Sequence, residues 1–311
     1  MIIKIGTRAS QLALWQAEDV AERIKAAGGA PEIIKIETKG DKILDKALSK
    51  IGSKGVFTEE LEAALRSHEI DIAVHSAKDL PSELDSDLPI VAFTDREKPN
   101  DVLVSFNKNI SLDDEIVVGT SSTRRVALLK HYHPKVKVVN MRGNLQTRFA
   151  KMESGDCDAM ILAYAGIHRM AYDERIAAIL PEKTFTPPAG QGCMAIQCHD
   201  GIDRNKRELL RESCNNDLTE KCLTAERAFL KTMHGGCSIP TFAMAELQGD
   251  LIVINGGIVS LDGQKMVRHT VVKSSTEAVV AGVELARRVL NDGGDKILSD
   301  IRTALDNEEQ G

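Results

Sequence analysis

Residues 70–79 read IDIAVHSAKD, a short apolar run that gives way at once to polar and charged residues. The run 70–75 is almost continuously apolar, which is typical of a strand that is buried on both faces of a parallel sheet. Ser76, Lys78 and Asp79 then fall just beyond the carboxyl end of that strand. Ligands of open α/β sheets bind at this edge. The stretch therefore predicts a fold class and, within it, the place of a site.

The alternation of strand and helix continues on both sides of this run. Strands are expected at 2–5, 33–38, 90–93, 102–105, 116–119, 136–140 and 159–163. Helices are expected at 10–27, 58–68, 122–131 and 145–153, the first of them capped by Ser10. Such alternation is typical of βαβ units around a mainly parallel sheet. We expect two similar α/β lobes with a connector at 94–100.

The last third of the chain has a different pattern. A long helix is expected at 218–233, followed by strands at 241–247, 251–260 and 265–273 and a closing helix at 275–292. The tight turns between the strands predict a three-stranded antiparallel sheet in a small α+β domain. A segment rich in Pro and Gly, 185–193, is expected to carry the chain back to the first lobe. The predicted domains are 1–95 with 190–213, then 100–186, then 217–311.

Composition limits the classes of partner. The 311 residues carry a net charge of −6, whereas nucleic-acid binders present a basic surface, so no nucleic-acid partner is expected. No apolar run is long enough to cross a bilayer, and the first residues lack the pattern of a secretion signal. We therefore expect a cytoplasmic protein without a membrane partner.

The six cysteines point to free thiols, with one of them in an unusual place. None lies in a Cys-x-x-Cys pair or at zinc-ligand spacing, so no metal site is predicted. Cys157, Cys198 and Cys222 are expected to be buried. Cys237 lies in HGGCSIP, 234–240, a glycine turn at the exit of a helix that should present the thiol. The residues alone leave three roles open for it: catalytic thiolate, redox thiol or attachment point.

Basic residues collect in five loops that come after predicted strands. Ser10, Ser122 and Asn144 belong to the same loops, and the basic residues are Arg8, Lys78, Arg124, Arg125, Arg142, Arg148 and Arg169. Arginine forks at helix N-termini bind carboxylates and phosphates. No phosphate-binding glycine motif is present, so several separate carboxylates are favoured over one phosphate group. Each arginine, taken singly, could equally be a surface or ion-pair residue, Arg125 above all because adjacent helical residues point in different directions.

Asp79 is the one acid in this basic set. Its carboxylate could move protons or stabilise a developing cation, or it could simply cap the turn before Pro81. The segment 49–55 holds two glycines and two lysines just before Phe57. It could be a lid that brings Lys54 to an anionic ligand, or a plain surface loop.

The chain resembles the porphobilinogen deaminase (hydroxymethylbilane synthase) family over nearly its whole length. The matching motifs are IGTRASQLALWQA (5–17), ETKGD (37–41), GSKGVFTEELE (52–62), DIAVHSAKDLP (71–81), VGTSSTRR (118–125), RGNLQTR (142–148), DAMILAYAGIHR (158–169), PAGQG (188–192) and HGGCSIP (234–240). Small departures fall at Ala77, Ala189 and Cys193, and none removes a charged group. The resemblance implies two lobes like those of periplasmic binding proteins, a third domain, and a monomer.

The resemblance also implies a reaction. A dipyrromethane cofactor is held at Cys237 through a thioether, and four porphobilinogen molecules are added head to tail with loss of ammonia. Hydrolysis then releases hydroxymethylbilane. Each pyrrole carries an acetate and a propionate, so the growing chain is a polyanion, which accounts for the basic loops.

Residue roles are carried over from the resemblance motif by motif. Asp79 matches the catalytic acid, which would stabilise the cationic azafulvene left after deamination. The implied cofactor-binding residues are Lys78, Ser122, Arg124, Arg125, Arg142, Asn144 and Arg148. The implied substrate-binding residues are Arg8, Ser10, Arg169, Lys54 and Phe57. The alternatives are a non-enzymatic, two-lobed carboxylate-binding protein and a cysteine-dependent transferase that is acylated at Cys237.

Overall fold

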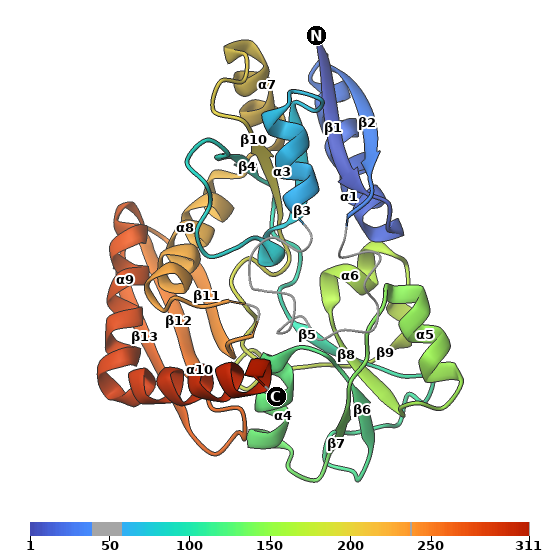
Figure 1. The fold of residues 1–311 in the computed structure, drawn as a ribbon, viewed down its shortest axis with the longest axis vertical. Helices are drawn as coiled ribbons and strands as arrows, with labels where there is room; N and C mark the ends of the chain where they lie inside the picture. The colour runs from blue at the N-terminus through green and yellow to red at the C-terminus, as the bar shows by residue number, and fades with distance from the viewer. Residues whose placement is uncertain (39–57, 237, 311) are drawn as a thin grey trace.

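The computed structural model describes residues 1–38, 58–236 and 238–310. Three predicted site residues, Lys54, Phe57 and Cys237, lie outside these ranges. Figure 1 shows one lobe at the top, a second at the lower right and a third domain at the left. No helix in the described ranges is both long enough and apolar enough to span a bilayer.

The first lobe is a five-stranded sheet in the order β2-β1-β3-β10-β4. β1 runs parallel to β2 and β3, whereas β10 runs antiparallel to both β3 and β4. Four strands therefore point one way and β10 the other. The strands are β1 (Ile2–Arg8), β2 (Ala30–Ile36), β3 (Ile72–Ser76), β4 (Ile90–Phe93) and β10 (Met194–Cys198), and the helices of this lobe include α1 (Gln11–Ala26), α3 (Glu59–Arg66) and α7 (Arg204–Cys214).

The second lobe repeats this plan with the order β7-β6-β8-β5-β9. β6 is parallel to β7 and β8, and β5 is the reversed strand, antiparallel to β8 and β9. The prediction of two similar, mainly parallel α/β lobes is confirmed. The elements are β5 (Asp101–Val104), β6 (Val117–Gly119), α4 (Thr123–Tyr132), β7 (Lys137–Val139), α5 (Leu145–Glu153), β8 (Ala159–Ala163), α6 (Tyr164–Arg169) and β9 (Ile176–Ile179).

Two crossovers connect the lobes and run side by side. Residues 94–100 lead from β4 to β5, and residues 180–193 lead from β9 back to β10. The backbone of Thr94 donates to Met194 O at 3.1 Å, and that of Glu97 donates to Gly192 O at 3.1 Å. Each crossover therefore delivers the chain to the reversed strand of a sheet. Their paired backbones form the connection between the two lobes.

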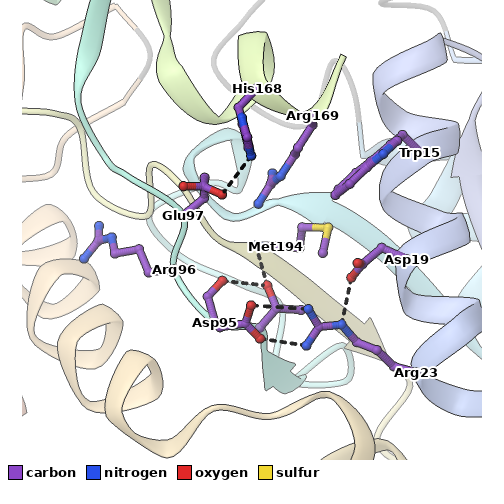
Figure 2. A pocket seen from close by; sticks show the side chains of 10 residues that line it. Trp15, Asp19, Arg23, Asp95, Arg96, Glu97, His168, Arg169 and Met194 are labelled. Carbon is purple, nitrogen blue, oxygen red and sulfur yellow. Dashed lines mark hydrogen bonds and ion pairs between the residues drawn. The ribbon is translucent and has the colours of Figure 1, made fainter. Parts of the chain in front are cut away.

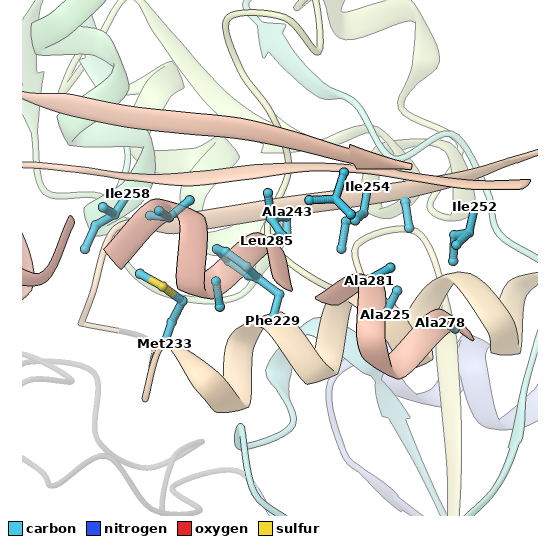
Figure 3. Close-up of a cluster of buried hydrophobic side chains, with 14 of the residues drawn as sticks. Ala225, Phe229, Met233, Ala243, Ile252, Ile254, Ile258, Ala278, Ala281 and Leu285 are labelled. Carbon is cyan, nitrogen blue, oxygen red and sulfur yellow. The ribbon is translucent and has the colours of Figure 1, made fainter. Parts of the chain in front are cut away.

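The third domain is a helix-backed antiparallel sheet, as predicted. Its strands β11 (Thr241–Gln248), β12 (Leu251–Val259) and β13 (Met266–Ser274) pair in order. Helices α8 (Asp217–Thr232) and α9 (Ala278–Val289) pack on the sheet through a buried apolar cluster that includes Phe229, Ile254 and Leu285 (Figure 3).

The end of the chain departs from the prediction. The helix expected at 275–292 is present as α9, but it does not close the chain, because a further helix, α10 (Asp295–Gln310), follows it. The two are separated by a kink in which Gly293 adopts a φ of 98°. The Gly293-Gly294 pair stops one helix, but the apolar residues Ile297, Leu298 and Ile301 beyond it pack into the domain core and favour another.

Candidate functional site

Three of the predicted polar site residues are helix N-caps. Ser10, Ser122 and Asn144 occupy the N-cap positions of α1, α4 and α5, and each side chain accepts a hydrogen bond from a backbone N–H in the first turn. A capped helix keeps its positive end fixed in place. All three caps come directly after parallel strands, β1 in the first lobe and β6 and β7 in the second, and the carboxyl-end edge of these sheets is called the rim here.

Arg124 and Arg125 converge on one buried carboxylate. Arg124 Nη2 lies 2.6 Å from Asp101 Oδ2, and Arg125 Nη2 lies 2.7 Å from Asp101 Oδ1. Each arginine also donates to a main-chain oxygen, of Thr186 at 2.8 Å and of Ile161 at 3.0 Å. Adjacent residues of a helix point in different directions, yet both guanidinium groups reach Asp101, because each binds a different oxygen of its carboxylate.

Asp101 and Gln191 are site residues that the sequence reasoning missed. Gln191 Nε2 donates to Asp101 Oδ1 at 2.9 Å, and Gln191 Oε1 accepts from Lys78 Nζ at 3.2 Å. These contacts join the second lobe, the returning crossover and the first lobe in one hydrogen-bonded chain. Both residues precede or begin reversed strands, whereas the predicted basic residues were those that come after a strand.

Lys78 and Asp79 lie on a single 3₁₀ turn, Ala77–Asp79, directly after β3. Burial lowers the pKa of Lys78 to about 8; nearby Asp79 opposes the fall, and Arg125 adds to it. Asp79 itself is exposed. A lysine of this kind is partly desolvated and close to other cations, so an anionic ligand would stabilise its charged form.

Arg142 and Arg148 extend the cluster on the second lobe. Burial lowers the pKa of Arg148 to about 10; Arg125 and Arg142 lower it too, whereas Asp79 raises it. Arg125 and Arg142 of the second lobe and Asp79 of the first lobe therefore all lie close enough to Arg148 to change its pKa. Arg148 Nε also donates to Gly143 O at 2.8 Å, which orients its side chain.

Arg8 is the last residue of β1 in the first lobe. It lies close enough to the buried His75 to help lower the pKa of that imidazole to about 4, an effect due mainly to burial and opposed by a hydrogen bond with Gln197. His75 Nε2 and Gln197 Oε1 are 3.1 Å apart, so Nε2 carries a proton and donates to the amide oxygen. This pair links β3 to β10.

Arg169 is the predicted residue that the structure places elsewhere. It lines a cavity of about 400 Å³ on the other side of the crossovers, between α1, residues 94–97 and α6 (Figure 2). Its Nη2 donates to Gly192 O at 2.9 Å, and its guanidinium carbon lies 5.4 Å from the centre of the Trp15 ring. Its charged neighbours are Asp19, Asp95 and Glu97 rather than Asp79.

Two family models match this chain. A model of porphobilinogen deaminase described as the dipyromethane cofactor binding domain matches residues 3–207, and one described as the C-terminal domain matches residues 220–291.

The chain belongs to the porphobilinogen deaminase family.

Porphobilinogen deaminases from bacteria align with it from end to end. That of Desulfosudis oleivorans is 49% identical over 305 residues, which cover 97% of this chain and 98% of the relative. That of Cytophaga hutchinsonii is 52% identical with the same coverage. Among solved structures, the methionine binding protein MetQ aligns with 68% of this chain and 89% of its own, at 13% identity and a TM-score of 0.45. At this score the likeness adds nothing to the strand orders described above.

The donor set at the rim fits the cofactor for which the family's main domain is named. Asp101 is occupied by two arginines, and it acts on Lys78 together with Asp79, whereas Asp79 is the acid that acts on Arg148. The Nε atoms of Arg124 and Arg125 are buried without a hydrogen-bond partner among the described residues. Positive charge therefore exceeds negative charge, and donors remain, as a group with several carboxylates requires. The described residues contain no cluster of three or more side chains suited to a metal ion.

Proposed function

We propose that this protein is a transferase that joins four porphobilinogen molecules head to tail, with loss of ammonia, and releases hydroxymethylbilane by hydrolysis. The product is a linear tetrapyrrole. The observation that carries the proposal is the cluster of cations from both lobes around Asp79. The names of the relatives support it, and they do not favour a non-enzymatic carboxylate-binding protein.

In the proposed reaction, the cationic residues bind and orient carboxylates. Arg8, Lys78, Arg142 and Arg148 approach the rim from both lobes, so acetate and propionate groups on successive rings can be held at once. The dipyrromethane, attached through a thioether at Cys237, supplies the pyrrole carbon to which a new unit is joined. Arg124 and Arg125, fixed by Asp101, hold their positive charge beneath this group.

Asp79 acts on the substrate itself in this proposal. When the aminomethyl nitrogen leaves as ammonia, the remaining pyrrole becomes cationic, and a carboxylate beside it stabilises that charge. Asp79 is exposed at the rim and is followed by Pro81, so its carboxylate can face the substrate while the turn stays fixed. The same carboxylate can carry the proton that the new ring loses.

The remaining assignments rest on the resemblance and on strand membership. We propose domains at 1–95 with 190–213, at 100–186 and at 217–311; β10 completes the first sheet, which supports the discontinuous first domain. We also propose that Ser10, Lys54, Phe57 and Arg169 contact substrate, and that Ser122 and Asn144 contact the cofactor. The protein is proposed to be a cytoplasmic monomer.

Intact-mass measurement tests the covalent attachment. We expect purified protein to exceed its polypeptide mass by two condensed porphobilinogen units. The excess should disappear in Cys237→Ser and persist in Cys222→Ala, which changes a buried thiol in the helix before it. A bare polypeptide mass in fully active protein would refute the attachment.

Asp79→Asn tests the catalytic assignment. We expect this variant to keep the added mass but to release ammonia from porphobilinogen at least about 100-fold more slowly, a typical loss for an acid–base group. Glu83→Gln changes an exposed residue that forms a surface ion pair with Lys231, and this variant should turn over normally. Near-normal turnover by Asp79→Asn would mean that the carboxylate only stabilises the turn.

A further inference from the structure

Buried apolar side chains join the third domain to each of the two lobes. Phe242 and Val259 of its sheet belong to one cluster with residues of the second lobe that include Leu128. Leu223 of α8 belongs to another cluster, with Leu80 of the first lobe. No cluster formed by the described residues contains buried side chains of both lobes. Apolar packing therefore fixes each lobe to the third domain but does not fix the lobes to each other.

Polar contacts at both of these interfaces are made to main-chain oxygens. On the second lobe, His131 Nδ1 lies 2.6 Å from Gly263 O, in the turn between β12 and β13. Gly263 has a φ of 74°, and a Cβ there would lie only 2.9 Å from Ala127 O of α4, so the turn is packed tightly on that helix. On the first lobe, Arg227 Nη2 donates to Pro81 O at 3.0 Å. Closely packed interfaces of this kind resist deformation.

The contacts that join the two lobes directly are of another kind. Gln146 Nε2 donates to Gln11 Oε1 at 2.6 Å, in an exposed hydrogen bond between the first turns of α5 and α1. One turn further along α1, the centre of the Trp15 ring lies 5.4 Å from the guanidinium carbon of Arg169 on α6. In Figure 1, α5 and the third domain lie on opposite sides of the molecule. An exposed amide hydrogen bond contributes little net stability, so the lobes can separate on this side at low cost.

The two glutamines are neighbours of residues that are proposed to bind ligand carboxylates. Gln11 follows Arg8 by three residues, and Gln146 lies between Arg142 and Arg148 in the sequence. Burial lowers the pKa of Arg148 to about 10, so its guanidinium is partly desolvated while the lobes are in contact. Separation of α1 from α5 would widen the space between the basic residues of the two lobes.

We infer that the hydrogen bond between Gln11 and Gln146 is a closing contact of the active-site cleft, and that it opens each time a porphobilinogen unit is added. The inference rests on the proposed function, in which the chain grows ring by ring while one end stays attached to the third domain. Because both lobes are packed on that domain, the added rings are accommodated where the lobes meet through polar contacts. In the closed state the contact positions Asp79 of the first lobe against the chain that the second lobe holds.

Three pairs of cysteines compare the three interfaces in the cofactor-loaded protein. Each pair is closed by a short bis-methanethiosulfonate reagent and reopened by a reductant. Cys237 is proposed to be occupied by the cofactor, and the other cysteines are buried. The pairs join residues whose side chains are close together, and they are Gln11→Cys with Gln146→Cys between the lobes, Lys130→Cys with Asp262→Cys between the second lobe and the third domain, and Glu83→Cys with Lys231→Cys between the first lobe and the third domain.

Intact mass and product formation give the result. The protein that is cross-linked between the lobes should stop at intermediates with fewer than four added units, and the reductant should restore product formation. The two proteins that are cross-linked to the third domain should form product at the rate of their reduced forms. Normal product formation with the lobes cross-linked would overturn the inference. So would an equal stop in either of the other two proteins.

Quenching of Trp15 emission by acrylamide tests the contact without turnover. Trp15 is the sole tryptophan of the chain and lies at the contact between α1 and α6. Quenching should fall in the protein with cross-linked lobes and stay unchanged in the other two, and equal quenching in all three would overturn the inference. If the wild-type protein forms no product but quenching falls as expected, the proposed function fails and the closing contact stands. If it forms product and the three cross-linked proteins behave alike, only the closing contact fails.

Discussion

Replacing Asp101 by asparagine should destabilise the second lobe and disorganise the cation cluster. The Asp101 carboxylate is fully buried and forms the ion pairs of 2.6 and 2.7 Å that hold Arg124 and Arg125. Asparagine keeps one oxygen and replaces the other by an NH₂ group. That group donates hydrogen bonds and would face a guanidinium that also donates, so one arginine loses its partner while it remains buried.

The magnitude of the loss depends on the burial of all three groups. Removing one partner of a buried ion pair costs about 3–5 kcal/mol, because the charge left behind is not compensated. With an unfolding entropy of about 2.1 cal/mol/K per residue, the 311 residues give about 0.65 kcal/mol/K, so such a loss lowers the thermal midpoint by roughly 5–8 °C. Lys78 is affected as well, since Gln191, which holds it, also binds Asp101. Turnover at substrate concentrations well below KM should fall with stability.

Thermal and urea unfolding, monitored by circular dichroism, measure the effect. The matched control is Asp156→Asn, an exposed aspartate of the same lobe, which should shift the midpoint by no more than about 1 °C. Burial alone would raise the pKa of Asp101, but Arg124 and Arg125 overcome this and hold it well below the usual range. Its stabilisation is therefore fully present above the unfolded-state pKa of about 4 and is lost only at lower pH, so the difference between wild type and Asp101→Asn should be the same at pH 5 and pH 8.

An Asp101→Asn protein with a wild-type midpoint would refute this reasoning. It would mean that solvent or a shifted backbone supplies hydrogen-bond partners for both arginines at no cost in stability. The buried ion pairs of Asp101 with Arg124 and Arg125 would then not organise the site. If the thermal midpoint falls but substrate affinity is unchanged, only the proposed link from Asp101 through Gln191 to Lys78 is refuted.

Two other contacts give predictions of the same kind. Burial lowers the pKa of Lys78 to about 8, so its positive charge is present below that pH and lost above it. Substrate affinity, measured as KM, should therefore fall as the pH rises from 7 to 9. Lys78→Arg stays charged over this range, so its KM should not show that change. Glu226 is fully buried and accepts hydrogen bonds from Arg96 and from the backbones of Gly190 and Ala245, so it ties both crossovers to the third domain. Glu226→Gln should cost about 3–5 kcal/mol in urea unfolding. Glu220→Gln, which changes a half-buried glutamate of the same helix that is paired with Arg211, should cost less than about 1 kcal/mol. Equal losses would contradict the role of Glu226 in tying the crossovers to the third domain.

Hydrophobic periodicity and helix-capping residues account for the features that the sequence predicted well. The apolar runs at β3, β4 and β8 and the N-cap at Ser10 are local features, and the structure has strands and a helix start at those places. We expected the loops that follow parallel strands to converge, and in the structure Lys78, Asp79 and Arg148 lie in one cluster. Arg169 lines a separate cavity with α1 and residues 94–97, and its contact with substrate stays a prediction.

Long-range pairing accounts for the features that were missed. Nothing local marks Glu226 as buried, since its helix, α8, is amphipathic and both of its lysines, Lys221 and Lys231, are exposed. Its role depends on Arg96 and Gly190, which are 130 and 36 residues away. A carboxylate of this kind is found only when the packing of three domains is known.

Asp101, by contrast, could have been predicted from topology alone. β4 ends at the rim, and the connector 94–100 is too short to return along the sheet before the next strand begins. β5 must therefore start at the rim and run away from it, and its first residue pairs with Ala163, the last residue of β8. The same holds for β10, whose first residue pairs with Ser76. In a two-lobed chain of this kind, a strand that follows a crossover begins at the same edge of the sheet at which the parallel strands end. Its first residues are therefore site candidates in the same way as the residues that follow a parallel strand.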